Sequence, residues 1–173
     1  EAVKEKINVS PQKTAVGRNL TVLENLEMIA GIYGFDRNAS REKAESMIKA
    51  FSLEEVQNAK ARTLSGGMQR RVSIAMALIS DPKILFLDEP TLGLDVLARR
   101  ELWSAIRKLK GKITDILTTH YMEEAEALSD RIGVMASGRL VKTGTAAELL
   151  AATGTQTLED AFVALAGGEG ANA

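Results

Sequence analysis

The feature of this chain that most constrains its fold is a run of four apolar residues, ILFL, at residues 84–87. Two acids, Asp88 and Glu89, follow it directly. A short, continuously apolar run bounded by polar and turn residues is typical of a strand buried on both faces of a parallel sheet. The run DILTT, residues 115–119, is a second candidate, with Asp115 expected at its start and facing solvent. Because these strand patterns alternate with helical ones, the sequence predicts an α/β fold.

Residues 20–80 carry a helical pattern in which we find no strand. The expected N-terminal caps are Thr21 with Glu24, Ser40, Ser52 with Glu55, and Ser65. The last of these helices begins within the sequence LSGGMQRR, residues 64–71, and is expected to reach about Ser80. The sequence therefore predicts an all-helical lobe inserted beside the parallel strands.

The chain of 173 residues is long enough for one domain with a sizeable core, and we divide it into four segments. The segments are 1–19 with a strand and a loop, 20–80 with the helical lobe, 81–144 with the α/β part, and 145–173 with C-terminal helices. The glycine-rich sequence at the end is expected to form a frayed tail.

Three local features are expected in the last two segments. Asp95 should cap a helix that reaches about Lys110, and Thr145 with Glu148 should form a capping box for another helix. The turn at Ser137-Gly138 should join two strands of a hairpin.

The composition excludes several classes of protein. With 22 basic and 23 acidic residues, the net charge of −1 gives no electrostatic case for binding nucleic acid or an anionic membrane. There is no cysteine, which excludes disulfides and thiolate metal sites. No apolar run approaches the roughly 18 residues of a transmembrane helix. The start of the chain, EAVKEKINVS, has neither an initiator methionine nor a signal-peptide pattern, so we expect that a gene does not begin there.

The polar residues that follow the two strand candidates are the first candidates for chemistry. Ligands of open parallel sheets bind at the carboxyl ends of the strands. There, Asp88 could hold Mg²⁺, and Glu89 could polarise a water for attack on a phosphoryl group. His120, the one histidine of the chain, could contact a terminal phosphate or orient that water. Taken singly, each has a plainer interpretation: a polar turn before Pro90, and a structural histidine.

Two further candidates lie outside the strand ends. Gln12 follows the first strand candidate and could contact Mg²⁺ or a water through its amide, although a solvated loop residue is the plainer interpretation. Ser65, Gly66 and Gly67 open a helix whose free N–H groups could bind a phosphate. An ordinary Ser-Gly cap is the alternative. The sequence contains no G-x-x-x-x-G-K-S/T phosphate loop to complete such a site.

The set and order of these segments resemble the ATP-binding cassette (ABC) transporter ATPases over nearly the whole chain. The matching positions are Gln12 with the Q-loop, residues 64–68 with the signature motif, residues 84–89 with Walker B, Asp95 with the D-loop, and His120 with the switch histidine. The resemblance implies a partial P-loop NTPase core, Mg²⁺-ATP as cofactor and ATP hydrolysis. The C-terminal segment looks like that of ABC-2-type exporter ATPases.

The resemblance also implies partners and roles. Two ATPase subunits of this family pack head to tail, so that Ser65, Gly66 and Gly67 would grip the γ-phosphate of ATP held by the other subunit. Gln69 and Asp95 are likewise implied to lie in the nucleotide site. The family's transmembrane permease subunits are separate chains, which places the ATPase at the cytoplasmic face of the membrane.

The missing Walker A motif is the one large departure from the family. We therefore expect this chain alone not to bind ATP in the usual way, and the ILFL strand to keep an open apolar edge that favours a swapped dimer or a complementary N-terminal piece. One alternative is a truncated, non-catalytic interaction module. Another is the head of a chromosome-organising ATPase, which the roughly forty residues of short helices between Gln12 and Leu64 disfavour, because such heads carry a long heptad coiled coil there.

Overall fold

The computed structural model describes residues 6–167 of the chain. The chain divides into two compact units, Glu1–Thr118 and Thr119–Ala173, and each is described by itself. Across residues 6–167, every helix is too short or too polar to span a lipid bilayer.

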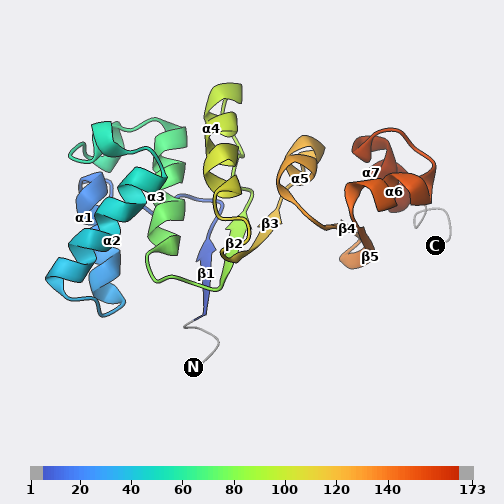
Figure 1. The fold of residues 1–173 in the computed structure, drawn as a ribbon. Coiled ribbons are helices and arrows are strands. Elements are labelled where there is room, and N and C mark those ends of the chain that lie inside the picture. The colour runs from blue at the N-terminus through green and yellow to red at the C-terminus, as the bar shows by residue number, and fades with distance from the viewer. Residues whose placement is uncertain (1–5, 168–173) are drawn as a thin grey trace. The chain divides into compact units, whose positions relative to one another are not determined.

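The first unit contains a three-stranded parallel sheet, as the sequence predicts. Its strands are β1 (Ile7–Ser10), β2 (Ile84–Asp88) and β3 (Thr114–Thr118), in the order β1-β2-β3 (Figure 1). The ILFL strand is therefore central and paired on both sides, so the expectation that it keeps an open edge is wrong. Among the described strands, the unpaired sheet edges belong to β1 and β3.

The two faces of β2 differ in burial, so the prediction of a strand buried on both faces is only half right. Leu85 and Leu87 are fully buried, whereas Ile84 and Phe86 on the opposite face are half-buried. Strand residues alternate between faces, and the neighbouring strands continue each face in register. The buried face is the one that α3 (Gly66–Leu78) covers, because the hydroxyl oxygens of Ser10 in β1 and Ser73 in α3 lie 3.4 Å apart.

Asp115 corrects a second expectation about the sheet. It lies near the start of β3, as predicted, but it is half-buried instead of facing solvent. Its register partner is the buried Leu85. Removal of water from the carboxylate raises the pKa of Asp115 from 3.8 to about 6.

The helical lobe begins with α1 (Val22–Ile32) and α2 (Arg37–Ala50), which pack against each other (Figure 1). The capping box of Thr21 and Glu24 is confirmed. The predicted cap at Ser40 is wrong, because the Asp36 carboxylate accepts the Ala39 N–H at 2.9 Å and starts α2 earlier. Ser40 lies buried inside the helix and donates to a backbone carbonyl.

The segment between α2 and α3 holds two short 3₁₀ turns, η1 (Glu54–Val56) and η2 (Ala61–Thr63), in place of the predicted third helix. Ser52 does not cap η1, because it adopts a left-handed backbone with φ of 52° and ends α2. The prediction that this lobe has no strand is confirmed for its described residues. Ser65 caps α3 as predicted, and α3 ends at Leu78, close to the expected Ser80.

After β2, the chain forms α4 (Val96–Arg107), which Asp95 caps as predicted. Both Leu97 and Ala98 donate their backbone N–H groups to the Asp95 carboxylate at 3.0 Å. This cap fixes the start of α4 directly after the loop that leaves β2.

The second unit contains α5 (Met122–Leu128), the hairpin β4 (Ile132–Ala136) and β5 (Arg139–Gly144), and then α6 (Ala146–Thr153) and α7 (Leu158–Gly167). The hairpin and the capping box of Thr145 with Glu148 are confirmed. Its core is formed by Ala125, Val134, Leu149 and Leu158. The predicted frayed tail lies beyond Gly167, outside the described residues.

Candidate functional site

The carboxyl ends of β2 and β3 bring Asp88 and Thr118 together. These residues are register partners, and the Thr118 hydroxyl donates to Asp88 Oδ1 at 2.7 Å. The Asp88 carboxylate is exposed, and this bond from the neighbouring strand β3 fixes the direction of one of its oxygens. The sequence singles out Asp88 but not Thr118, because nothing local to the chain shows that residues thirty positions apart meet.

Glu89 continues from Asp88 in an unusual backbone conformation. Its φ is 47°, the left-handed region that residues with a side chain seldom adopt. The Glu89 N–H donates to the Thr118 carbonyl at 3.1 Å and to the Thr118 hydroxyl at 3.2 Å. The Glu89 carbonyl accepts from the Leu92 N–H at 3.2 Å. Left-handed backbone costs about 1–2 kcal/mol and clusters at functional sites, so its presence at the predicted general base is informative.

Arg70 is a site residue that sequence reasoning misses. Its side chain is buried, with 4% of the residue exposed, and it reaches from α3 to the backbone of two loops. Nη2 donates to the Asp88 carbonyl at 2.7 Å, Nε donates to the Pro90 carbonyl at 2.9 Å, and Nη1 donates to the carbonyls of Pro11 and Gln12. Since α3 is buried nearly all round, its apolar pattern gives no signal for the direction of Arg70.

Gln12 lies in the loop that follows β1 and is exposed. Its carbonyl accepts from Arg70 Nη1 at 3.3 Å, which ties this loop to the backbone around Glu89. The structure thus brings the backbones of Gln12, Asp88 and Pro90 to one guanidinium.

The start of α3 presents a helix N-terminus. The Ser65 hydroxyl accepts the Met68 N–H at 3.2 Å, and Gln69 donates its side-chain amide to the Leu64 carbonyl at 3.0 Å. The first N–H groups of any helix lack intrahelical partners. Ser65 and Gly66 are exposed, so this end of α3 is accessible in the described part of the chain.

The two glycines of LSGG have different surroundings. A Cβ placed on the exposed Gly66 would meet only Leu94 Cδ2, at 3.9 Å. A Cβ on the buried Gly67 would lie 2.9 Å from the Cβ of Ala98 in α4. Gly67 is therefore required by the packing of α3 on α4, whereas nothing in the described residues requires Gly66. This packing also brings the start of α3 close to Asp95, which caps α4.

His120 belongs to the second unit, where it is exposed. Its ring centroid lies 4.1 Å from that of Tyr121, with a tilt of 39° between the ring planes. It follows the end of β3 by two positions in the chain, which is the place that the sequence predicts for it.

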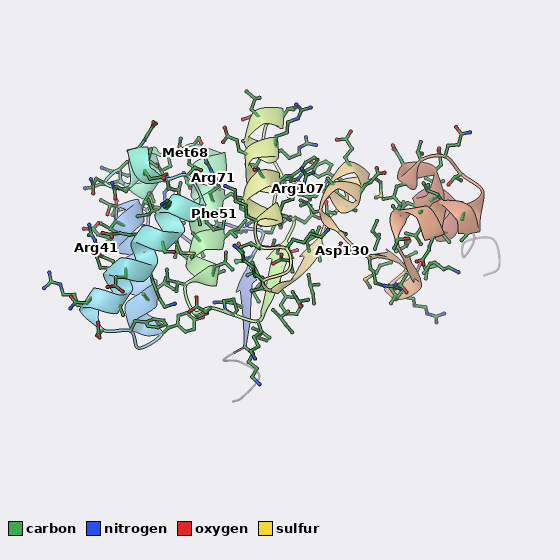
Figure 2. The ribbon with its side chains drawn as sticks, viewed as in Figure 1. Arg41, Phe51, Met68, Arg71, Arg107 and Asp130 are labelled. Atoms are coloured by element: carbon green, nitrogen blue, oxygen red, sulfur yellow. The ribbon has the colours of Figure 1, made fainter. Side chains whose placement is uncertain are left out.

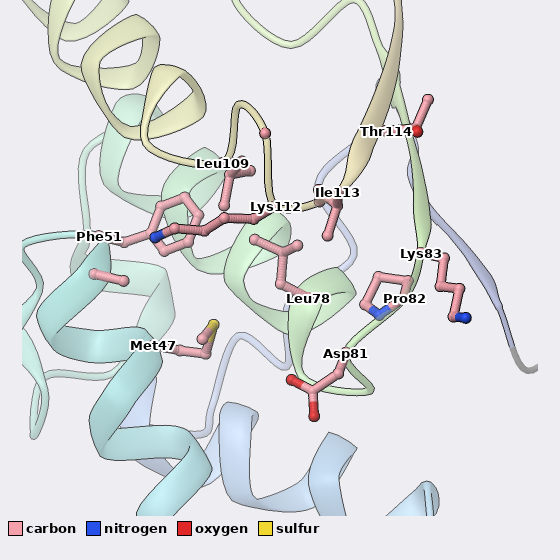
Figure 3. Close-up of a pocket in the computed structure, with 12 residues that line it drawn as sticks. Met47, Phe51, Leu78, Asp81, Pro82, Lys83, Leu109, Lys112, Ile113 and Thr114 are labelled. Atoms are coloured by element: carbon pink, nitrogen blue, oxygen red, sulfur yellow. The ribbon is translucent and has the colours of Figure 1, made fainter.

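A pocket of about 680 Å³ lies in the first unit, away from these residues. It is lined by the ends of α2 and α3 and by the segments that precede β2 and β3 (Figure 3). Phe51, Leu78, Lys83 and Lys112 are among the residues that line it. Because it opens at the amino ends of the strands, this pocket is separate from Asp88 and Glu89 at their carboxyl ends.

The donor set at the carboxyl ends fits a magnesium ion that is held mainly by other ligands. No group of three or more His, Asp or Glu side chains within residues 6–167 forms a closed metal site. Mg²⁺ commonly uses one or two protein oxygens and completes its shell with waters and nucleotide phosphates. Asp88 could supply the protein share, together with Gln12, whose backbone carbonyl accepts from Arg70 as that of Asp88 does. The start of α3 fits a phosphate group.

Comparison with known proteins agrees with this geometry. The sequence profile of the ABC transporter family matches residues 1–92, more than half of the chain. The daunorubicin resistance ATP-binding protein DrrA3 of Streptomyces coeruleorubidus is 40% identical over 159 residues, which cover 91% of this chain and 50% of that protein. The human phospholipid-transporting ATPase ABCA3 is 41% identical over 143 residues, 83% of this chain and 8% of that protein.

A solved structure, described as the ATP-binding subunit of an ABC transporter, matches with a TM-score of 0.77 and 27% identity. The match covers 94% of this chain and 69% of that one. The chain thus spans about half the length of the DrrA3 protein and a small part of ABCA3. Sequence, fold and strand-end geometry lead to the same conclusion: the chain belongs to the ABC transporter family.

Proposed function

We propose that this chain is part of the ATP-hydrolysing subunit of an ABC-type exporter, of the ABC-2 class. The observation that carries the proposal is the arrangement at the carboxyl ends of β2 and β3. There Thr118 orients Asp88 and holds the backbone of Glu89. An acid pair at the end of a buried parallel strand suits a reaction at a phosphate bound beyond the strand.

The residues of the chain divide the work in this proposal. Bound Mg²⁺-ATP would supply the γ-phosphate that water attacks, together with the positive charge of Mg²⁺, which offsets the negative charge of the phosphate. Asp88, with Gln12, holds the ion or its waters, and Glu89 accepts a proton from the attacking water. The start of α3, with Ser65 and Gly66, donates N–H groups to the phosphate of a nucleotide bound by a second ATPase subunit. Gln69, Asp95 and His120 are proposed to complete the nucleotide site.

The proposed partners are a second ATPase subunit and separate transmembrane permease subunits, which place this chain at the cytoplasmic face of the membrane. The exporter class is supported by the C-terminal resemblance and by relatives whose names include daunorubicin resistance and phospholipid transport. The near-neutral net charge of −1 gives no support for nucleic acid as a partner. The chromosome-organising alternative is disfavoured because the lobe before Ser65 contains helices of 11 and 14 residues among its described parts.

The test is ATP hydrolysis by the membrane assembly that co-purifies with this chain, compared with the Glu89→Gln variant. We expect Glu89→Gln to lower kcat by about 10²-fold or more, as for the loss of a general base, while a fluorescent ATP analogue still binds. The matched control is Glu101→Gln, because the exposed Glu101 pairs with Arg71 at 3.3 Å and its described contacts include none of the proposed site residues. Equal turnover in all three proteins would remove Glu89 from this role.

A second candidate function is that of a non-catalytic module. The sequence contains no Walker A motif, the element that would hold the β- and γ-phosphates. Titration of Mg²⁺-ATP into the isolated chain shows whether this chain binds ATP by itself. No binding at millimolar ATP would mean that the start of α3 serves a nucleotide brought by another subunit. Mg²⁺-dependent binding would mean that the described residues hold phosphate themselves.

A further inference from the structure

We infer that Arg70 is a positioning residue that sets the direction of Glu89 and fixes it to the Gln12 loop. The inference rests on the proposed role of Glu89 as general base and adds a residue to it. Its basis is that one buried guanidinium donates to four backbone carbonyls on two loops.

The contacts of Arg70 lie on both sides of Glu89. Nη2 binds the carbonyl before it, on Asp88, and Nε binds the carbonyl after it, on Pro90. The Glu89 N–H is held by Thr118 and its carbonyl by Leu92. The peptide groups around Glu89 are therefore fixed from α3 and from β3 at once, which accounts for the persistence of a left-handed backbone at φ 47°.

The remaining nitrogen joins a second segment. Nη1 donates to the carbonyls of Pro11 and Gln12, which lie in the loop after β1 and are 59 and 58 positions from Arg70 in the chain. A guanidinium is planar and presents five donors in fixed directions, so a shift of either loop must break or bend bonds to the other. The position of Gln12 and the direction of Glu89 are thus set together.

Arg71 provides a matched control on the same helix. It also donates to backbone carbonyls, those of Phe51 at 3.2 Å and Ser52 at 3.4 Å, and it pairs with Glu101. Figure 2 shows Arg71 and Phe51 in the helical lobe. Its side chain is 12% exposed, so it too is largely buried. It differs from Arg70 in that its described contacts do not include the two site loops.

The experiment compares Arg70→Lys and Arg71→Lys in the co-purified assembly. Lysine keeps the charge but loses the planar fork. We expect Arg70→Lys to lower kcat by about 10-fold or more with the KM for ATP changed less than about 2-fold, since misplacing a reacting group affects the chemical step. Arg71→Lys should leave kcat within about 2-fold. In the Glu89→Gln background, Arg70→Lys should cause no further loss, because the group that it positions is already gone.

Hydrogen exchange supplies a readout that does not depend on turnover. Arg70→Lys should reduce the protection of the Glu89 and Leu92 amides, and Arg71→Lys should not. Unchanged protection in Arg70→Lys would overturn the inference even if ATPase activity failed to appear at all. Lost protection with normal kcat would overturn the positioning role. If Arg70→Lys does not fold, Arg70→Gln, which keeps two amide donors on a shorter stem, is compared in the same way.

Discussion

At the scale of single residues, the hydroxyl of Thr118 controls how Asp88 is presented. It donates to Asp88 Oδ1 at 2.7 Å and accepts from the Glu89 N–H. Thr118→Val removes both bonds at nearly constant volume. If Asp88 holds Mg²⁺ as proposed, the Mg²⁺ concentration for half-maximal ATP hydrolysis should rise about 10-fold, the usual cost of losing a group that orients a ligand. A Mg²⁺ titration of the assembly checks this.

The control for that prediction is Thr114→Val, at the other end of the same strand. Thr114 is exposed and lies four positions from Thr118, so the two variants carry the same change, threonine to valine, in the same strand. Only the Thr118 variant should change the Mg²⁺ requirement. An equal effect of both would mean that strand packing, and not the orientation of Asp88, is responsible.

Asp115 gives a second prediction at this scale, for stability against pH. Burial raises the pKa of Asp115 from 3.8 to about 6, so the folded chain binds a proton that the unfolded chain has released between these values. The stability of the folded chain at this site is therefore highest below pH 3.8, falls as the pH rises from 3.8 to about 6, and stays low above that. For a fully buried carboxyl group, this rise in pKa would correspond to a loss of about 3 kcal/mol in the free energy of unfolding at high pH. Because Asp115 is only half-buried, solvent reduces the expected loss to about 1 kcal/mol.

Asp115→Asn should remove this loss. We expect the free energy of unfolding of the variant to exceed that of the unchanged chain by about 1 kcal/mol at pH 8, and the two to agree below about pH 3, where the carboxyl group is neutral in both states. Urea unfolding across this pH range measures the difference. A constant difference at every pH would show that packing, and not ionisation, separates the two proteins.

At the scale of elements, the two adjacent glycines at the N-terminus of α3 are expected to have different roles, one in packing and one in phosphate binding. Gly67→Ala would place a Cβ 2.9 Å from Ala98 and push α3 away from α4. We expect a loss of about 1–3 kcal/mol in the free energy of unfolding, typical of overpacking. Gly66→Ala has room, and the better helix propensity of alanine should leave stability unchanged or raise it by up to about 1 kcal/mol.

Although Gly66→Ala should not lower stability, we expect it to lower ATP hydrolysis. A methyl group on this exposed turn of the helix would stand where the proposed phosphate approaches the backbone, so ATP hydrolysis by the assembly should fall about 10-fold or more while the chain stays folded. Denaturant unfolding and turnover are measured on the same preparations. Full activity in Gly66→Ala would contradict a close approach of phosphate to this turn.

The elements also show why part of the structure can be predicted and part cannot. Caps such as Thr21 and Asp95 are confirmed because their hydrogen bonds are local in sequence. Ser40 fails because Asp36, four positions earlier, takes the same role first. The strand ends with Asp88 and Glu89 follow from a short apolar run, whereas the bonds of Arg70 to segments as far as 59 positions away have no local signal.

At the scale of the whole molecule, the chain has two separate cores. The first unit holds the sheet and the helical lobe, with fully buried residues such as Leu26, Leu85 and Leu102. The second unit has its own small core, in which Leu149 is fully buried. Units with separate cores can unfold as separate cooperative units. Trp103, the single tryptophan of the chain, lies in α4 of the first unit, so its fluorescence follows the unfolding of that unit.

Leu149→Ala therefore tests whether the two units are independent in stability. Removing a fully buried leucine side chain costs about 2–5 kcal/mol, a large share of what so small a core can supply. We expect the amides of residues 122–165 to lose hydrogen-exchange protection while the Trp103 fluorescence transition in urea stays where it is. The matched variant Leu26→Ala, in the first unit, should shift that transition to lower urea. If Leu149→Ala shifts the Trp103 transition as far as Leu26→Ala does, the two cores unfold as one, and the stability of the strand ends that carry Asp88 and Glu89 depends on the hairpin and helices that follow them.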